Sequence, residues 1–354
     1  MANTTNPGLE GVLVADTKIS DVDGERGKLV IAGSDVEQLA AVTSFEVAAG
    51  QVLAAGGAAA FDPAAIGGAR AAAWELVSRL GDALDHTDGM DALRTALGHV
   101  PSTGGDPGDA LAVIGAAPVF VAAWSRRRSG QPAIAPDPAL GQAADYLRMT
   151  TGRAPEPSAV RALDAYLVTV IDHAMSASTF TARVIASTQS DLISAIVGAV
   201  GALKGPLHGG APGPVLDMFD GIGAPGNAEA WLLAELASGR RIMGMGHRVY
   251  RVRDPRAAVL EDAVRPLRSP RLELARAVEQ AAAKILRERK PDRSLAANVE
   301  FYTAVLLDAV GLPREQFAPT FAVSRIAGWS AHVIEQHRTG RLIRPASCYI
   351  GPMP

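Results

Sequence analysis

Residues 157–171 read PSAVRALDAYLVTVI, and this stretch decides the fold class. Its apolar side chains recur every three or four positions and share one helical face: Val160, Leu163, Leu167, Val170 and Ile171. That spacing predicts an amphipathic helix, with Ser158 as its N-cap. Residues 180–200 repeat the pattern at steps of four and predict a second helix that ends near Gly205. Two successive helices of this kind favour a helical fold.

Proline residues mark the start of two further helices. Asp254-Pro255 supplies a capping carboxylate and then a first-turn proline, whose missing N–H costs no helical hydrogen bond. Ser269-Pro270 repeats this pattern of a capping side chain followed by proline, and a helix is predicted after it. The last turn of that helix is basic, which suits the negative end of the helix dipole. The basic residues of that turn are Arg287, Arg289 and Lys290. Helical spacing also occurs in residues 304–310 and 321–336.

Strand signals are few and lie near the N-terminus. Residues 11–15 and 28–32 flank the turn sequence DVDG at residues 21–24, which predicts a hairpin. Aromatic residues make up only 5% of the chain, and small side chains suit closely packed helices better than a β-sandwich. The sequence therefore predicts an all-α fold with a small N-terminal β element.

Charge and composition exclude several classes of protein. The chain has 354 residues, enough for two domains, and its 34 Lys and Arg against 37 Asp and Glu give a net charge of −3. So small a charge predicts no nucleic-acid or membrane-surface partner. The charge-free apolar stretch at residues 110–125 contains Pro118 and is shorter than the roughly 20 residues of a membrane span. A single cysteine, Cys348, fits a reducing compartment, and we expect a cytoplasmic protein.

Three of the seven histidines have settings typical of a functional site. The sequence has no Walker motif, zincin motif, nucleophile elbow or cysteine pair. His173 ends the first helix described above, His208 lies in the glycine-rich stretch GPLHGG, and His247 follows Gly244-Met245-Gly246. Glycine beside a histidine lets a ligand or backbone approach closely. The other histidines, which we interpret as structural, are His86, His99, His332 and His337.

Arginines in the second half of the chain point to an anionic ligand. Arg256 falls in the first turn after Asp254-Pro255, where a cation is disfavoured unless an anion lies beside it. Further arginines, on what we predict to be separate elements, are Arg325, Arg341 and Arg344. Such a set suits a small di- or tricarboxylate. By contrast, we interpret the triplet Arg126-Arg127-Arg128 as a solvent-facing run.

Glu300 supplies a carboxylate just before the apolar run that starts at Phe301. Together with two histidines it allows two chemistries. One is a base assisted by two imidazole hydrogen-bond donors, for enolisation beside a carbonyl. The other is a facial triad of two histidines and one carboxylate that binds a divalent metal. Sequence spacing leaves both open.

Six stretches resemble the citrate synthase family, which includes the 2-methylcitrate synthases. They are GLEGVLVADTKISDVDGERGKLV (8–30), ASTFTARVIASTQSD (177–191), GALKGPLHGGA (201–211), IMGMGHRVYRVRDPRA (242–257), NVEFYTAVLLDAVGLP (298–313) and FAVSRIAGWSAHVIEQHRTGRLIRPASCYIGP (321–352). The segments KGPLHGGA, GHRVYRVRDPRA and RLIRP, in this order, are highly specific. Between residues 44 and 155 the resemblance is faint.

The resemblance implies a two-domain, mostly helical homodimer. Residues 1–210 and 307–354 would form the large domain, and residues 211–306 a small domain that closes over the substrates. It also implies an acyltransferase of the tricarboxylic acid cycle, which condenses acetyl-CoA with oxaloacetate and water to give citrate and CoA. The CoA ester would be a co-substrate, with no permanently bound cofactor and no metal.

The same resemblance implies roles for individual residues. Glu300 would take a proton from the methyl group of acetyl-CoA, His208 would stabilise the enol oxygen, and His247 would polarise the oxaloacetate carbonyl. The oxaloacetate carboxylates would be held by His173, Arg256, Arg325 and Arg344, the last from the other subunit. The CoA moiety would meet Gly244, Met245, Gly246 and Arg251.

Two residues depart from the family pattern. Glu300 stands where the base is usually Asp, and Ala174 stands where Glu usually follows the histidine. Two alternatives therefore accompany the leading function. One is a 2-methylcitrate synthase that uses propionyl-CoA. The other is a non-catalytic paralogue that binds a CoA ester or a dicarboxylate.

Overall fold

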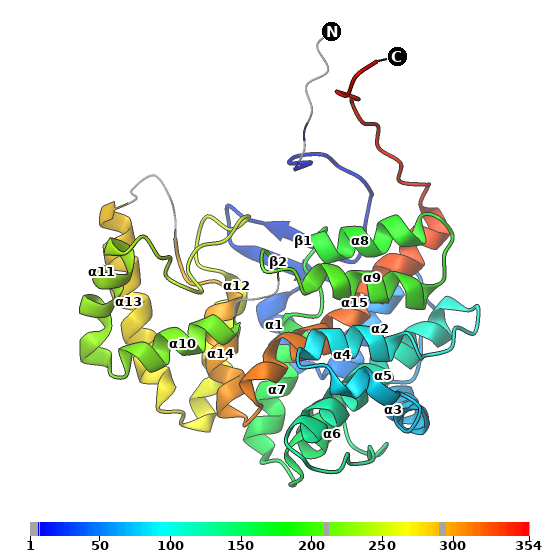
Figure 1. Ribbon diagram of the computed structural model, residues 1–354, viewed down its shortest axis with the longest axis horizontal. Helices are drawn as coiled ribbons and strands as arrows, with labels where there is room; N and C mark the ends of the chain where they lie inside the picture. The colour runs from blue at the N-terminus through cyan, green and yellow to red at the C-terminus, as the bar shows by residue number, and fades with distance from the viewer. Residues whose placement is uncertain (1–5, 7, 209–211, 290–294, 354) are drawn as a thin grey trace.

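The computed structural model describes residues 6, 8–208, 212–289 and 295–353, and these residues are mostly helical (Figure 1). The α-helices are α1 (Val36–Val42), α2 (Phe45–Ala55), α3 (Ala65–Val77), α4 (Gly89–Leu97), α5 (Asp106–Arg128), α6 (Gln142–Thr151), α7 (Pro157–Thr169), α8 (Ala177–Ala186), α9 (Leu192–Leu203), α10 (Pro212–Ile222), α11 (Ala228–Ala237), α12 (Pro255–Val264), α13 (Arg271–Arg289), α14 (Val299–Ala309) and α15 (Phe317–Thr339). Short 3-10 turns are η1 (Gly81–Asp85), η2 (Pro225–Asn227), η3 (Arg265–Leu267) and η4 (Arg314–Gln316). The predicted all-α class is confirmed.

A small antiparallel sheet lies at the N-terminus, as predicted, but its first strand is not where the sequence placed it. The strands are β1 (Ser20–Asp23), β2 (Lys28–Ile31) and β3 (Ser34–Asp35), with Ser20 opposite Ile31. The prediction of a strand at residues 11–15 is wrong, because DVDG forms the end of β1 and the turn follows it. Gly27, with φ of 64°, and the hydrogen bond from Arg26 N to Asp23 Oδ1 (2.9 Å) build that turn.

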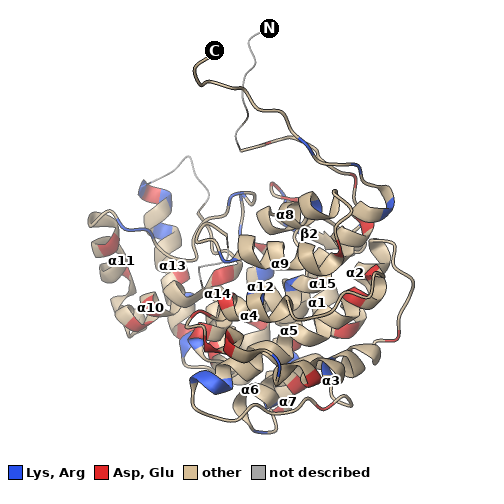
Figure 2. Ribbon diagram, turned by 45° about the vertical axis from the view of Figure 1, so that its right-hand side comes forward, with Lys and Arg blue, Asp and Glu red and all other residues tan. Residues whose placement is uncertain are grey.

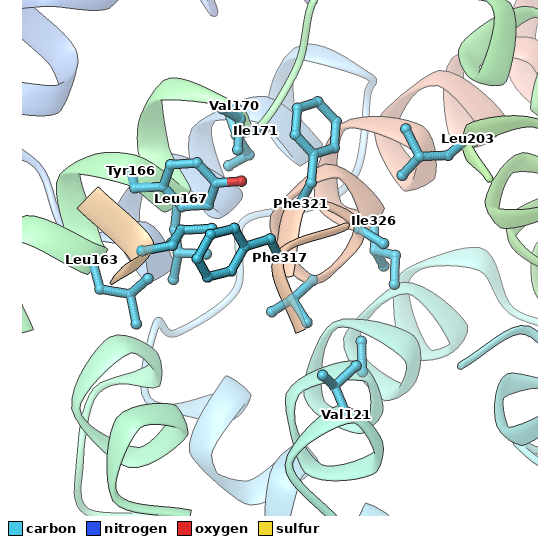
Figure 3. Close-up of a cluster of buried hydrophobic side chains, with 14 of the residues drawn as sticks. Val121, Leu163, Tyr166, Leu167, Val170, Ile171, Leu203, Phe317, Phe321 and Ile326 are labelled. Atoms are coloured by element: carbon cyan, nitrogen blue, oxygen red, sulfur yellow. The ribbon is translucent and has the colours of Figure 1, made fainter. Parts of the chain in front are cut away.

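The core is built around two long buried helices, α5 and α15. Gly115 of α5 lets that helix approach α3 closely, because a Cβ there would lie 2.6 Å from the Cβ of Ala69. Figure 3 shows Leu163, Tyr166 and Leu167 of α7 facing Phe317 and Phe321 of α15. By length and composition α5 could cross a membrane, yet 83% of its apolar window is buried inside the fold. Its apolar surface is therefore used in packing.

Several helix boundaries differ from the sequence prediction. The helix predicted over residues 180–200 is two helices, because Gln189 adopts φ of 65° and Asp191 then caps α9 by accepting a hydrogen bond from Ser194 N (2.9 Å). The N-cap of α7 is Glu156 rather than Ser158, since Pro157 already occupies the first helical position. His173 lies beyond α7, which ends at Thr169.

Other boundaries agree with the prediction. Asp254 caps α12 by accepting a hydrogen bond from Arg256 N (3.0 Å), with Pro255 in the first turn. Helix α13 begins at Arg271, one residue after the predicted proline, and ends at Arg289, while Lys290 lies outside the described residues. Helices α14 and α15 contain the two runs predicted at residues 304–310 and 321–336, except that α14 ends one residue earlier.

The basic triplet at the end of α5 is not wholly solvent-facing. Arg126 is buried, and its guanidinium donates to the carbonyl oxygens of Pro132 (2.5 Å) and Thr150 (3.3 Å). Arg127 pairs with Asp85 at the surface. The prediction is therefore wrong for Arg126, because a carbonyl group in the loop after α5 and another in the last turn of α6 accept its donors.

Two groups of helices lie side by side in the molecule. Helices α10, α11 and α13 gather at one side, and α12 and α14 lie between them and the larger group (Figure 1). The described segments near the two ends of the chain leave the body in the same direction (Figure 1). Figure 2 shows basic and acidic residues interspersed along the ribbon, in keeping with the small net charge.

Candidate active site

Two of the predicted histidines lie together where the loops after α7 and before α12 meet. The ring centroids of His173 and His247 are 5.5 Å apart and edge to face. Tyr250 packs against both rings, and its hydroxyl lies 3.2 Å from Nε2 of His173. Burial, followed by the charges of Arg256 and Arg325, lowers the pKa of His173 well below its usual value. His173 is therefore a neutral ring at pH 7.

Backbone amides fix the tautomer of His247. Its Nδ1 accepts hydrogen bonds from the N–H groups of Val249 (3.0 Å) and Tyr250 (3.1 Å), so the ring proton lies on Nε2. Nη2 of Arg256 lies 3.4 Å from that nitrogen. Burial, then the charge of Arg256, lowers the pKa of His247 to about 4. Two hydrogen-bond donors thus converge, and an acceptor oxygen placed between them would satisfy both.

Arg256 and Asp254 form a buried ion pair at the start of α12. Nε and Nη2 of Arg256 donate to the two carboxylate oxygens of Asp254 at 3.0 and 2.7 Å. Asp254 also accepts from Val299 N (3.2 Å), which ties α12 to the start of α14. The anion expected beside Arg256 is therefore supplied, at least in part, by its own N-cap.

Arg325 on α15 is a buried cation whose charge is balanced only at longer range, by Asp172. It is only 1% exposed, its Nε donates to the carbonyl of Val170 (2.7 Å), and its guanidinium lies 4.6 Å from the ring centroid of Phe321. Within the described part of the chain, it forms no ion pair with a carboxylate. Burial lowers its pKa to about 10. Because an unpaired buried charge is costly, an anionic ligand would stabilise this site.

Glu300 lies in the first turn of α14 with a carboxyl group that titrates near neutral pH. Asn298 caps this helix by accepting from Glu300 N (3.0 Å) and donates to the carbonyl of Gly246 (2.8 Å). Burial raises the pKa of Glu300 to about 7, although Arg256 and Arg325 act in the opposite direction. Oε2 is buried and has no hydrogen-bond partner among the described residues. A carboxylate with this pKa suits a general base.

His208 presents one free donor after its other ring nitrogen has been satisfied. Nε2 lies 2.7 Å from Oγ of Ser178 and accepts from Ser178 N (3.3 Å). Ser178 Oγ in turn accepts from Trp329 Nε1 (3.1 Å). The proton of His208 therefore lies on Nδ1, and burial lowers the pKa of the ring to about 4. Its glycine neighbours at positions 209 and 210 lie outside the described residues.

The glycine turn before His247 is fastened to the segment that leads to Glu300. Gly244 and Gly246 have φ of 72° and 86°, values that favour glycine. Met245 pairs with Ala297 in an isolated bridge, and Asn298 N donates to the Gly244 carbonyl (2.9 Å). The turn and the base are therefore held in one unit.

Arg251 lies a few residues beyond this turn and is exposed. Its Nε is 4.0 Å from Glu25. Arg341 and Arg344 lie on the exposed C-terminal tail, which runs away from the body (Figure 2). The structure of one chain therefore does not bring Arg344 to the other predicted residues.

A metal site is not evident in the described residues, where no three His, Cys, Asp or Glu side chains gather closely enough to hold an ion. Three residues of the site were not predicted from the sequence: Tyr250, Ser178 and Trp329. Tyr250 lies three residues after His247 and could have been noticed there, whereas no sequence spacing connects Ser178 or Trp329 with His208.

Comparisons with known proteins point to one family. The family description "Citrate synthase, C-terminal domain" matches residues 8–346. A Mycobacterium tuberculosis protein named putative citrate synthase 2 is 41% identical, over 98% of this chain and 93% of its own length. The 2-methylcitrate synthase of the same species is 37% identical, over 97% and 90%. The citrate synthase of Thermoplasma acidophilum, solved as a ternary complex with carboxymethyl coenzyme A and oxaloacetate, superposes with a TM-score of 0.88 at 27% identity, over 99% and 97%.

Proposed function

The chain belongs to the citrate synthase family, whose members are acyltransferases, and from that premise we propose that it condenses acetyl-CoA with oxaloacetate and water to give citrate and CoA. The observation that carries the proposal is the carboxyl group of Glu300, buried with a pKa of about 7 and coupled electrostatically to the buried arginines Arg256 and Arg325. This arrangement offers a carboxyl group that is about half ionised near pH 7 and can therefore accept a proton, in a setting that attracts an anion.

Oxaloacetate binding follows from the cationic side of the site. Arg325 lacks a carboxylate partner among the described residues, so a substrate carboxylate would restore its charge balance. Arg256 and His173 would complete the receptor. The carbonyl oxygen of oxaloacetate would accept a hydrogen bond from Nε2–H of His247. Because the imidazole ring as a whole is uncharged, it would polarise the carbonyl as a neutral donor.

Glu300 and His208 would generate the nucleophile. The carboxylate of Glu300 would take a proton from the methyl group of acetyl-CoA, while Nδ1–H of His208 donates to the thioester oxygen that becomes the enol. The enol carbon then attacks the carbonyl carbon of oxaloacetate, the thioester C=O re-forms as the enol proton returns to His208, and the oxaloacetate oxygen takes the proton from Nε2 of His247. Exchange through solvent then moves the proton held by Glu300 back to His247, and water attacks the thioester. Hydrolysis of the resulting thioester releases citrate and the CoA thiol.

The CoA moiety and the second subunit complete the proposal. Backbone groups of Gly244, Met245 and Gly246 would meet the adenine, and the exposed guanidinium of Arg251 would lie near the phosphates. Residues 211–306 would form the small domain that closes over the substrates. Arg344 would reach the site from the partner in a cytoplasmic homodimer.

Propionyl-CoA is the alternative acyl donor. The relatives named putative citrate synthase 2 and 2-methylcitrate synthase differ little in identity, 41% against 37%, so overall similarity does not choose between them. The extra methylene of Glu300 relative to Asp moves the base by about one bond length, which changes the space left for the acyl group.

The test measures oxaloacetate-dependent release of the CoA thiol, with acetyl-CoA and propionyl-CoA side by side. Release with citrate as the product by mass supports the leading function. Faster release with propionyl-CoA, giving 2-methylcitrate, supports the alternative. No release with either ester, combined with thermal stabilisation by oxaloacetate, would point to a non-catalytic binding protein.

A further inference from the structure

The hydroxyl group of Ser20, on strand β1, closes a small ring of hydrogen bonds around His173. Ser20 Oγ donates to Oδ2 of Asp172 (2.5 Å) and accepts from the N–H of Ala174 (2.8 Å). These two residues flank His173 in the chain. Ala174 has φ of 48°, a left-handed conformation that is unfavourable for alanine and needs external support.

Asp172 is in turn fixed from helices α15 and α8. Its Oδ2 accepts from Nε2 of His332 (3.2 Å), because Nδ1 of His332 already accepts from Nε of Arg183 (3.0 Å). Arg183 also pairs with Glu335. All of these side chains are buried. Burial disfavours the ionised form of Asp172, but His332 and Arg325 outweigh it and hold the pKa of Asp172 below its usual value.

The other end of the same hairpin contacts the loop that carries His247. The carbonyl of Gly24, in the β1–β2 turn, accepts a hydrogen bond from Arg251 N (2.9 Å). A Cβ on Gly24 would overlap the carbonyl oxygen of Val249. One on Gly27 would lie 2.5 Å from Cγ2 of Val252. Backbone therefore packs against backbone at this point, two residues from His247.

We propose that the β1–β2 hairpin is a positioning element that sets the spacing of His173 and His247, with Ser20 holding the first loop and the Gly24 turn holding the second. The naming of oxaloacetate as the ligand affected rests on the proposed function. The hairpin itself does not touch the reacting atoms, so Ser20 and Gly24 are positioning residues.

The expected effects follow from geometry. Removing the Ser20 hydroxyl leaves the partly buried Ala174 N–H without a partner and Asp172 with one partner fewer, so the turn that carries His173 relaxes. A methyl group at Gly24 pushes the His247 loop away from the hairpin. Since displacement of a binding group by about 1 Å can cost up to a hundredfold in rate, we expect changes of about tenfold for each variant.

The experiment compares Ser20→Ala and Gly24→Ala with Ser20→Thr, which restores a hydroxyl, and with the control Gly68→Ala. Gly68 lies exposed on α3 with open space where a methyl group would point, and its φ is not positive. We expect Ser20→Ala to raise the KM for oxaloacetate about tenfold, while the KM for acyl-CoA stays within twofold of the wild-type value. Ser20→Thr should reverse most of this rise. Gly24→Ala should lower kcat about tenfold.

A second readout separates failure of this proposal from failure of the proposed function. Histidine ring resonances of the ligand-free protein, assigned by single substitutions, report loop position without turnover. Ser20→Ala should shift the His173 resonances, Gly24→Ala should shift those of His247, and those of the remote His99 should stay. If the kinetic constants of Ser20→Ala and Gly24→Ala lie within twofold of those of Gly68→Ala, the proposal is overturned. If the wild type has no turnover, unchanged histidine resonances in these two variants overturn it instead. A lower Tm alone would also overturn it, since that reports only a structural role.

Discussion

The imidazole Nε2 of His208 lies 2.7 Å from the hydroxyl oxygen of Ser178, and this contact determines which ring nitrogen of His208 can act on a ligand. The N–H of Trp329 and the hydroxyl of Ser178 form a short chain that ends at Nε2. Nδ1 therefore carries the proton. Since the pKa of His208 is about 4, the ring donates as a neutral group throughout the physiological pH range.

Replacing Ser178 tests this arrangement. Ser178→Ala removes the hydroxyl that faces Nε2 and leaves the buried N–H of Trp329 without its acceptor, so the tautomer of His208 is less firmly set. We expect kcat for CoA release to fall about tenfold while the KM for oxaloacetate changes little. Ser194→Ala, on the exposed face of the next helix, is the matched control. A kcat equal to that of the control would refute the assigned role.

Substitution of Glu300 tests the base. Glu300→Gln keeps the size of the side chain but cannot accept a proton, and we expect a loss of about 10²- to 10⁴-fold in kcat. Glu300→Asp should retain part of the rate, with about a hundredfold loss from the shorter reach. Single-turnover release of CoA thiol measures both. If Glu300→Ala kept most of the turnover, another group would have to be the base.

The raised pKa of Glu300 also predicts an unusual dependence of stability on pH. Its pKa is about 7 in the folded protein against an ordinary 4.5, so between these values the folded state binds more protons than the unfolded state. The free energy of unfolding contributed by this group therefore falls as the pH rises from about 4.5 to 7. Relative to the wild type, Glu300→Gln should therefore gain stability as the pH increases through this window. Over the same window, kcat of the wild type should rise because the base becomes ionised.

Urea denaturation at pH 5 and pH 8 measures the first effect, and the pH profile of kcat measures the second. Because Glu300→Gln lacks the ionisable group, the difference in unfolding free energy between the two proteins isolates this carboxyl from all others. A difference that did not change with pH would mean that the group titrates at its ordinary pKa in the folded protein.

Local signals in the sequence predicted the elements that depend on local chemistry. The cap formed by Asp254 and Pro255 works because both residues act within one turn. Helices α14 and α15 are buried on nearly all sides, and their long apolar runs reflect this burial. The prediction of the first strand failed because residues 11–15, with two valines, have the higher strand propensity, whereas the actual strand β1 contains two aspartates and is selected by its pairing with β2.

The candidate site shows the same division. The sequence offered four residues for selection because a predicted helix end, glycine turns or a helix start marks them: His173, His208, His247 and Glu300. Their protonation states could not be predicted, since burial in the folded protein is the largest cause of every pKa shift, and His208 also depends on distant partners: Ser178 lies 30 residues away, and Trp329 lies 151 residues from Ser178. Arg256 and Asp254 are only two residues apart, yet their ion pair could not be predicted. The same carboxylate of Asp254 caps α12 and pairs with Arg256, and the sequence pattern of a cap does not reveal the second interaction.

The role of Arg344 can be tested by mixing two inactive variants. This residue lies on an exposed tail, and we expect it to reach the site of the partner subunit. In a heterodimer of Glu300→Gln and Arg344→Ala subunits, one site would then combine the intact Glu300 of one chain with the intact Arg344 of the other. Each parent homodimer has two defective sites. Co-expression with two affinity tags, purification of the mixed dimer and measurement of CoA release decide the question.

If Arg344 is donated across the interface, the mixed dimer should regain about half of the wild-type turnover per dimer, because one of its two sites is complete. If Arg344 acts within its own chain, both sites of the mixed dimer stay defective and its activity equals the mean of the two parents. A mixture of Glu300→Gln with His208→Gln subunits is the control. Both of these side chains are assigned to the same chain's site, so no complementation is expected there. Recovery in the Arg344 mixture alone would therefore require that two subunits build each site.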